Sequence, residues 1–290
     1  MRSMPRSPFA VGKRYDPRAM ARQYVHLDSR TLAYFDSAPG DHEAPVLVLI
    51  HAFPLGAGMW EGQVKALPEG WRLIAPDLRG FGGSTIAEPD DNPSIDDYAT
   101  DVIDMLHHLG IERPVVGGLS MGGYVAMAML RRAPVIARGV ILANTRAGAD
   151  SSEGRANRRG MLAVLDREGA SGVARDMMPK LLGTTTLDTR PDVEPFVRRL
   201  IKQQSPGAVR GAVQRMMSRP DSMSTIAALM VPTLIIAGDE DVLTPQDDAG
   251  KMAVALPMAE LVVLPRTGHL SNLEQPQLFN DTLRAFLSRL

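Results

Sequence analysis

Apolar residues form short runs of strand type along most of the chain. A strand pair, Gln23–Ser29 and Thr31–Phe35, is predicted to turn at Asp28-Ser29-Arg30. Pro45–Ile50 is apolar without interruption, which is typical of a central parallel strand covered on both faces. Further runs of this kind are Trp71–Ala75, Pro114–Val116, Gly139–Ala143, Pro232–Gly238 and Glu260–Leu264.

Between these runs, apolar positions recur at helical spacing. Ser94-Ile95-Asp96-Asp97 resembles a capping box and starts a predicted helix that ends at Gly110. Further helices are expected near Met59–Leu67, from Ser120 to Pro134 and in Asn272–Leu290. Because strands and helices alternate, we predict an α/β fold with a mostly parallel sheet of about eight strands and right-handed crossovers.

The alternation stops between about Arg146 and Ile226, where helical segments are separated by Gly and Pro and no strand is evident. We therefore predict a helical cap or lid at 146–226, inserted into an α/β core made of 23–145 and 227–290. Residues 1–22 carry six basic residues and one acidic residue, without the apolar stretch of about 7–15 residues that a signal peptide has. They are expected to form a flexible extension, and Met20 is an alternative to Met1 as the start.

Composition excludes several classes of protein. The 290 residues are 44% hydrophobic and 22% charged with a net charge of −1, as in an ordinary globular protein without nucleic-acid affinity. Cysteine is absent, so disulfides and thiolate metal sites are excluded. No apolar run approaches the ~20 residues of a membrane span. A cytoplasmic protein with no membrane association, no metal and no cofactor is expected, and its oligomeric state is not indicated.

Gly118, Ser120 and Gly122 fit the pattern G-x-S-x-G between a strand and a helix. A serine hydroxyl becomes a useful nucleophile when it stands on a sharp turn beside a base and a site for the developing oxyanion. Such a turn brings strand and helix backbones together, so glycines two positions before and after the serine remove clashing Cβ atoms. Ser120 is the predicted nucleophile.

Chain order selects the partners of this serine. In a parallel α/β sheet with such a turn, the acid and then the histidine follow the serine. His269 is the one histidine of six that follows Ser120, so it is the predicted general base. Gly238–Pro245 offers three consecutive carboxylates, of which Asp241 is preferred because the third position after the glycine can turn back toward the site. Asp239 is the alternative, with a role in organising the turn if Asp241 is the acid.

Two backbone N–H groups are expected to form the oxyanion hole. One follows the nucleophile, at Met121, and the other lies in the loop after the third strand, at Phe53. Pro54 has no N–H to donate, which favours Phe53 over its successor. His51 is interpreted as a residue that orders this loop rather than as a second base.

With these motifs in order, the chain resembles the α/β-hydrolase fold family over nearly all of residues 23–290. The resemblance is carried by five segments: His51–Pro54, Asp77–Ser84, the turn at Ser120, Gly238–Pro245 and Gly268-His269. It implies that Asp77 and Arg79 belong to a structural loop. The turn at Ser120 and Leu142–Arg146 are similar to bacterial 3-oxoadipate enol-lactonases and related small esterases, although those lactonases commonly have an Asn-Ser-Leu-Gly type stretch at the His51–Pro54 position.

The predicted function is a cofactor-free serine hydrolase that cleaves a small carboxylic ester or lactone through an acyl-enzyme. Carbon–carbon bond hydrolysis, perhydrolysis and ligand binding without turnover remain alternatives, since relatives run the first two with the same triad. Seven residues of the predicted lid are candidates for contact with a small apolar substrate, though packing is the commoner role: Met177, Met178, Leu181, Leu182, Met216, Met217 and Met223. Arg146, Arg158 and Arg159 are candidates for a substrate carboxylate, with a solvated surface as the default.

Overall fold

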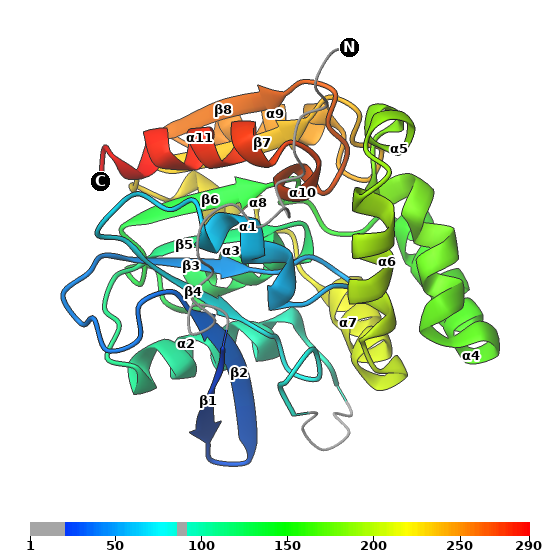
Figure 1. Ribbon diagram of the computed structural model, residues 1–290, viewed down its shortest axis with the longest axis horizontal. Coiled ribbons are helices and arrows are strands. Elements are labelled where there is room, and N and C mark those ends of the chain that lie inside the picture. Colours follow the sequence, from blue (N-terminus) through cyan, green and yellow to red (C-terminus); the bar gives the residue numbers. More distant parts are fainter. Residues whose placement is uncertain (1–20, 86–91) are drawn as a thin grey trace, which may run out of the picture.

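An eight-stranded sheet runs through the centre of the computed structural model, which describes residues 21–85 and 92–290 (Figure 1). Almost all of the extension expected at 1–22 lies outside the described residues. The spatial order is β1-β2-β4-β3-β5-β6-β7-β8. The strands are β1 (Arg22–Leu27), β2 (Arg30–Asp36), β3 (Val46–Ile50), β4 (Arg72–Pro76), β5 (Val115–Leu119), β6 (Gly139–Ala143), β7 (Thr233–Gly238) and β8 (Ala259–Leu264).

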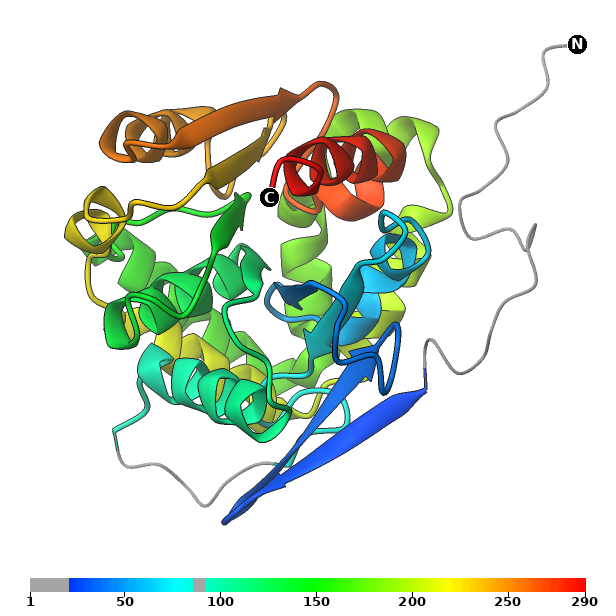
Figure 2. The same ribbon diagram turned by 90° about the vertical axis from the view of Figure 1, so that its left-hand side faces the viewer.

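The sheet is parallel from β4 to β8 and antiparallel at the β1–β2 edge. Every residue of β3, β5, β6 and β7 is buried, because helices cover both faces of these central strands. β2 pairs with β4 only through Tyr34–Asp36, so the rest of the β1–β2 hairpin extends away from the sheet (Figure 2). The predicted α/β architecture with about eight strands is confirmed.

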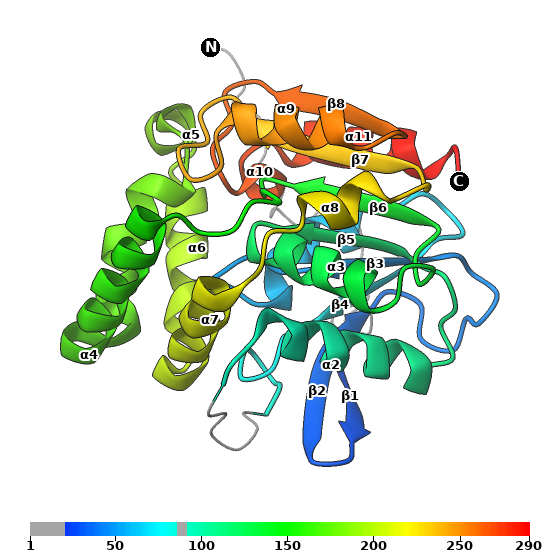
Figure 3. The ribbon, with the colours of Figure 1, turned by 180° about the vertical axis from the view of Figure 1, so that it is seen from behind.

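Helices pack on both faces of the sheet. Figure 3 shows α2, α3, α8 and α9 over one face, while α1 and α11 lie over the other in Figure 1. The helical elements are the 3-10 turn η1 (Ala57–Trp60), α1 (Glu61–Val64), α2 (Ile95–His108), α3 (Met121–Arg132), α4 (Ser152–Leu181), α5 (Thr184–Thr189), α6 (Val193–Lys202), α7 (Pro206–Ser218), α8 (Met223–Ala227), α9 (Gln246–Ala255), α10 (Ser271–Glu274) and α11 (Pro276–Leu287).

The start of α2 follows the predicted capping pattern. Ser94 Oγ accepts a hydrogen bond of 3.2 Å from Asp96 N, and the Asp97 carboxylate accepts one of 2.9 Å from Ser94 N. These bonds satisfy N–H groups that have no acceptor within the helix. The first turn of α2 is thereby fixed where the sequence places it.

Residues 146–226 contain helices and no strand. α4 packs on α6 and α7, and these three helices lie beyond the carboxyl ends of the parallel strands (Figure 1). α4 is bent at Gly169, whose φ of 62° is a left-handed conformation that favours glycine. α8, by contrast, packs against α3 and α9 of the core. The division of the chain into a core and a lid at 146–226 stays a prediction.

Within residues 21–85 and 92–290, no helix is long and apolar enough to cross a membrane. The same residues bring together no group of three or more His, Asp or Glu side chains suited to a metal ion. The cytoplasmic location stays a prediction.

Candidate active site

Ser120 stands on the sharp turn between β5 and α3. Its φ of 57° and ψ of −114° lie in a left-handed region that is unusual for a residue with a side chain, at a strain of about 1–3 kcal/mol. Ser120 N donates to Ala143 O at 2.9 Å, and Ser120 O accepts from Thr145 Oγ1 at 2.8 Å. The turn is therefore tied to the end of β6, while Ser120 Oγ has no hydrogen-bond partner among the described residues.

Glycines allow the backbones around this turn to touch. A Cβ on Gly118 would lie 2.1 Å from the carbonyl group of Gly122, and a Cβ on Gly122 would lie 2.1 Å from Ile50 O. Both contacts are with backbone atoms that side-chain rotation cannot move away. The G-x-S-x-G spacing is thus a steric requirement of the strained turn that exposes Ser120.

His269 and Asp241 form a buried pair at the carboxyl ends of neighbouring strands. His269 Nδ1 lies 2.8 Å from Asp241 Oδ2, and the side chains are 2% and 0% exposed. Asp241 follows β7, and His269 follows β8, which is parallel to β7, so the two loops meet at one edge of the sheet. Hydrogen bonding to a carboxylate through Nδ1 leaves Nε2 of the imidazole to exchange a proton with a nucleophile.

Asp241 is surrounded by hydrogen-bond donors. Its Oδ1 accepts from the amides of Leu243 and Thr244 at 2.8 and 3.0 Å. Its Oδ2 accepts from Thr244 Oγ1 at 2.6 Å and from Asn144 Nδ2 at 2.9 Å. Burial alone would raise the pKa of Asp241, but His269 and the side-chain hydrogen bonds hold that pKa well below its usual range. The carboxyl group is therefore ionised at neutral pH.

The alternative acid, Asp239, lies elsewhere in the same turn. Its Oδ1 accepts a hydrogen bond of 3.0 Å from Thr267 N, so it joins the two loops through the backbone. Only Asp241 of these two carboxylates contacts His269. The geometry favours the assignment of Asp241 as the acid and of Asp239 as the residue that organises the turn.

The two amides expected to bind an oxyanion flank the serine. Met121 is the first residue of α3, where the N–H has no acceptor within the helix and the helix dipole favours negative charge. Phe53 lies in the loop after β3, and no hydrogen bond from Phe53 N is present within residues 21–85 and 92–290. Both N–H groups are thus available for a ligand oxygen.

His51 and Asp77 order the surrounding loops. His51 Nδ1 donates to Ala52 O at 3.0 Å, and His51 Nε2 accepts from Leu78 N at 3.1 Å, so both ring nitrogens are used. Burial lowers the pKa of His51, which keeps the ring neutral. Asp77 accepts from the amides of Ala57 and Gly83 at 2.8 and 3.0 Å. These contacts agree with the loop-ordering roles expected for both residues.

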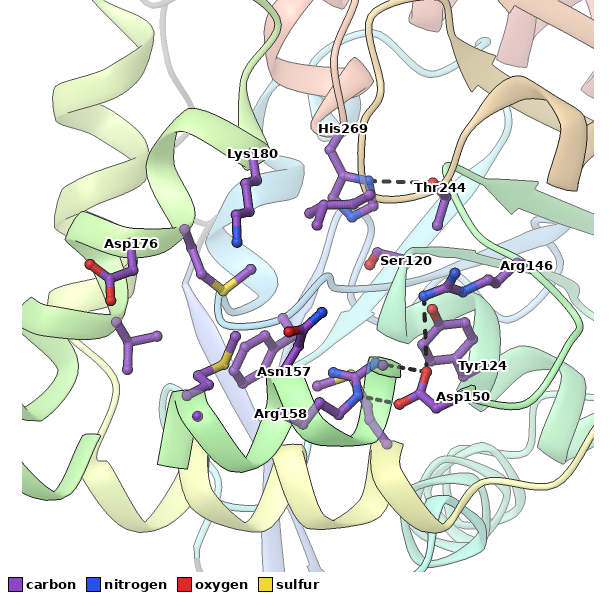
Figure 4. A pocket seen from close by; sticks show the side chains of 18 of the residues that line it. Ser120, Tyr124, Arg146, Asp150, Asn157, Arg158, Asp176, Lys180, Thr244 and His269 are labelled. Carbon is purple, nitrogen blue, oxygen red and sulfur yellow. Dashed lines mark hydrogen bonds and ion pairs between the residues drawn. The ribbon is translucent and has the colours of Figure 1, made fainter. Parts of the chain in front are cut away.

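A cavity of about 340 Å³ opens beside Ser120 and His269 (Figure 4). Phe53 and Thr244 line it from the core side, and α4 and α7 close it from the other side. Of the predicted lid residues named from the sequence, Met177 and Met216 lie on its wall, whereas Met178, Leu181, Leu182, Met217 and Met223 are not among its lining residues. Apolar and charged side chains share the lining of this cavity, and sites for small organic ligands likewise combine apolar walls with polar groups.

An ionic cluster forms one wall of the same cavity. Asp150 accepts from Arg158, while Arg146 lies farther away, at 3.9 Å (Figure 4). Asp150 also accepts from Arg219 Nη1, at 2.6 Å. Arg158 and Arg146, two of the three candidates for a substrate carboxylate, line the cavity, whereas Arg159 is exposed and does not. Because the single negative charge of Asp150 is shared between Arg158 and Arg219, it compensates the charge of Arg158 only in part.

Sequence reasoning missed Asn144 and Thr244 as partners of Asp241. Asn144 follows β6 with a φ of 44°, and its Oδ1 accepts from Ser271 Oγ at 2.5 Å. An Asn directly after an apolar strand is a signal for such a left-handed position. Thr244 stands three residues after Asp241, a spacing at which a hydroxyl reaches back to a carboxylate in a turn.

Comparison with known proteins assigns the family. Residues 45–276 match the family model described as the alpha/beta hydrolase fold. The chain is 28% identical to 3-oxoadipate enol-lactonase 2 of Acinetobacter baylyi over 253 residues, covering 86% of this chain and 91% of the relative. The structure superposes on a thermophilic esterase from Thermogutta terrifontis, solved with malate bound, with a TM-score of 0.85, 35% identity and coverage of 93% and 98%.

The enol-lactonase from Burkholderia xenovorans superposes with a TM-score of 0.83 at 26% identity, covering 92% of this chain and all of that one (100%). The family model spans most of the chain, and the whole architecture agrees with these relatives. The chain belongs to the alpha/beta hydrolase fold family.

Proposed function

We propose that this chain is a cofactor-free serine hydrolase that cleaves a small carboxylic ester or lactone through an acyl-enzyme on Ser120. The single observation that carries the proposal is the 2.8 Å contact between His269 Nδ1 and Asp241 Oδ2 beside the cavity that Ser120 lines. The family and the relatives support the coarser statement that the chain is an ester-cleaving hydrolase.

Acylation begins when Ser120 Oγ attacks the substrate carbonyl carbon and its proton passes to His269 Nε2. Asp241 holds the Nδ1–H side of the ring and stabilises the imidazolium. The carbonyl oxygen gains negative charge and accepts hydrogen bonds from Phe53 N and Met121 N, each such donor contributing about 10²–10³ in rate. The tetrahedral intermediate then expels the alcohol oxygen, which takes the proton from His269.

Deacylation repeats these steps with water. His269 takes a proton from the water as its oxygen attacks the acyl carbon, and returns that proton to Ser120 Oγ as the acid leaves. For a lactone, the alcohol released in the first half remains attached to the acyl group, so one hydroxy acid is the product. The proposal requires no cofactor because Ser120 itself carries the acyl group.

The cavity favours a small substrate. A volume of about 340 Å³ lies at the lower end of ligand sites and accommodates a small ester or a lactone ring. The curated relatives include enol-lactonases, and a superposing structure is an esterase, which supports both bond types.

A panel of lactones and short-chain esters tests the proposal and separates the two substrate types. Purified wild-type protein and Ser120→Ala are compared with each substrate at equal concentration. We expect many turnovers per molecule with at least one member of the panel and none with the variant. A single burst equal to the protein concentration, with no further product, would favour a ligand-binding member of the fold.

A further inference from the structure

A carboxylate outside the proposed triad is buried beside His269. Glu274, at the end of α10, is 1% exposed. No ion pair in the described ranges includes its carboxylate, and Arg190 donates to the backbone oxygen of Glu274, at 3.1 Å, rather than to the side chain. Burying a carboxylate without a cation is energetically costly, so the hydrogen-bond donors around it indicate its structural role.

Four neutral donors surround this carboxylate. Oε2 accepts from Gly268 N at 3.0 Å, Gly183 N at 2.8 Å and Thr186 Oγ1 at 2.7 Å. Oε1 accepts from Leu270 N at 2.9 Å. Burial raises the pKa of Glu274 above its usual range, although the bonds from Gly183, Thr186, Gly268 and Leu270 oppose the effect.

These donors come from two separate parts of the fold. Gly268 and Leu270 flank His269, so the carboxylate binds the backbone on both sides of the imidazole-bearing residue. Gly183 and Thr186 belong to the corner between α4 and α5, residues 183–186, which lies beside α10 (Figure 1). The Glu274 side chain thus connects the loop that carries His269 to the corner at 183–186.

The corner is in van der Waals contact with the His269 loop. A Cβ on Gly268 would lie 2.1 Å from Gly183 N, and a Cβ on Gly183 would lie 2.8 Å from Gly268 N. Leu270 N also donates to Leu181 O, at 3.2 Å. A displacement of the corner would therefore be transmitted to the backbone of His269.

The Glu240 side chain binds the same corner, and its hydrogen bonds to the corner do not involve the loop that carries His269. Its carboxylate accepts from Thr185 N at 2.9 Å, from Thr184 Oγ1 at 3.2 Å and from Thr185 Oγ1. It is the residue before Asp241, and its side chain has no contact with Asp241 among these hydrogen bonds. Glu240 is therefore a matched control for Glu274.

We propose that Glu274 is a positioning residue that fixes the His269 backbone relative to Asp241 and Ser120, with the corner at 183–186 as the second anchor. This inference rests on the proposed function of the Ser120, His269 and Asp241 side chains. The ring of His269 reaches Asp241 Oδ2 from one backbone position, and a shift of about 1 Å at a reacting group is enough to cost about 10²-fold in rate.

A carboxylate suits this position better than an amide. Each oxygen of Glu274 faces at least one N–H group. A glutamine would turn its NH₂ group either toward Leu270 N–H or toward the amides of Gly183 and Gly268, so at least one pair of donors would face each other. Glu274→Gln therefore loosens one side of the loop while preserving size.

The test compares wild type, Glu274→Gln and Glu240→Gln on p-nitrophenyl acetate, with folding checked by thermal unfolding and circular dichroism. We expect kcat of folded Glu274→Gln to fall about 10- to 100-fold with KM within about twofold, and kcat of Glu240→Gln to stay within about threefold. The far-downfield proton resonance of the His269–Asp241 hydrogen bond should broaden or vanish only in Glu274→Gln. A folded Glu274→Gln with wild-type kcat and an unchanged resonance overturns the inference.

Thr186→Val covers the case in which Glu274→Gln does not fold. It removes one donor from the corner and leaves Glu274 and the His269 loop chemically intact. A severalfold lower kcat with a broadened resonance supports the inference, and a wild-type kcat overturns it. Failure of the proposed function is recognised separately, because the wild type would then show no steady turnover, or Ser120→Ala would retain it, whatever the Glu274 variants do.

Discussion

Asn144 Nδ2 donates a hydrogen bond of 2.9 Å to Asp241 Oδ2, the same oxygen that lies 2.8 Å from His269 Nδ1. Asn144 and Asp241 are 97 positions apart in the sequence, and they follow the neighbouring parallel strands β6 and β7. The acid is thus held by the sheet edge itself and not only by its own turn. This arrangement predicts which carboxylate is essential.

Asp241→Asn should lower kcat by about 10⁴, because an amide in place of the carboxylate favours the wrong tautomer of the His269 ring. Asp239→Asn should have a small effect, since the Asp239 side chain accepts from the backbone amide of Thr267 and from no other group among the described residues. Steady-state kinetics of both variants on p-nitrophenyl acetate checks the assignment. A crippled Asp239→Asn beside a mildly affected Asp241→Asn would transfer the role of acid to Asp239.

The strain at Ser120 predicts a difference between two inactive variants. Ser120→Ala keeps a Cβ at φ 57°, whereas Ser120→Gly relieves a strain of about 1–3 kcal/mol. Glycine also loses about 0.4–1 kcal/mol of stability, because it gives the unfolded chain more conformational entropy. Ser120→Gly should therefore be about 1 kcal/mol more stable than Ser120→Ala. Urea unfolding of the two proteins measures the difference, and a Ser120→Gly protein less stable than Ser120→Ala by about 0.4–1 kcal/mol would show that the turn stores no strain.

Replacement of glycine by alanine should have opposite effects on stability at Gly122, beside the Ser120 turn, and at Gly250, in α9. Gly122→Ala places a Cβ 2.1 Å from Ile50 O and should destabilise the protein by about 3 kcal/mol or more. Gly250→Ala in α9, where a Cβ meets nothing within 4 Å, should stabilise it by about 0.5–1 kcal/mol. Chemical denaturation of both variants is the measurement. A tolerated Gly122→Ala would contradict the close approach of α3 and β3.

The lowered pKa of Asp241 predicts part of the acid sensitivity of the fold. The pKa is lower in the folded protein than the ordinary value of 3.8, so the ionised carboxylate contributes stability above pH 3.8 that is lost as pH falls through the folded pKa. Asp241→Asn lacks this contribution at every pH. Its free energy of unfolding should therefore decline less than that of wild type between about pH 4 and pH 2. Parallel declines in urea titrations across this range would show that Asp241 is not a source of the acid sensitivity.

Met177 and Met178 offer a matched pair for the role of the helical segment. Both are buried on α4, but only Met177 lines the cavity. Truncation of either should cost about 2–5 kcal/mol of stability. Met177→Ala should also change KM for butyrate and hexanoate esters while leaving kcat on the acetate ester nearly unchanged, and Met178→Ala should not change this preference. Identical substrate preferences of the two variants would show that the helical segment does not determine which substrate is used.

The features that the sequence predicted well are those set by local pattern. The apolar run at Val46–Ile50 is a fully buried strand, and the capping residue Ser94 starts α2 as expected. The turn at Ser120 was predictable because its glycines are a steric requirement within five residues. Chain order added His269 and the position in the turn added Asp241, and their contact matches the prediction while their catalytic role remains to be measured.

The features that escaped the sequence depend on long-range contacts. Nothing near Glu274 in the sequence indicates that Gly183 and Thr186, 91 and 88 positions away, converge on its carboxylate. Asn144 likewise meets Asp241 only because β6 and β7 are paired. Periodicity reports which face of an element is buried, and it does not report which polar groups meet once the elements pack.

The central claim is that Ser120 carries the acyl group, and the most direct measurement is mass spectrometry of the acyl-enzyme. Wild-type protein mixed with p-nitrophenyl acetate and quenched with acid should carry one acetyl group, located on the peptide that contains Ser120. Ser120→Ala should carry none and show no turnover. Steady turnover with the acetyl group on another residue, or turnover that survives in Ser120→Ala, would contradict the account.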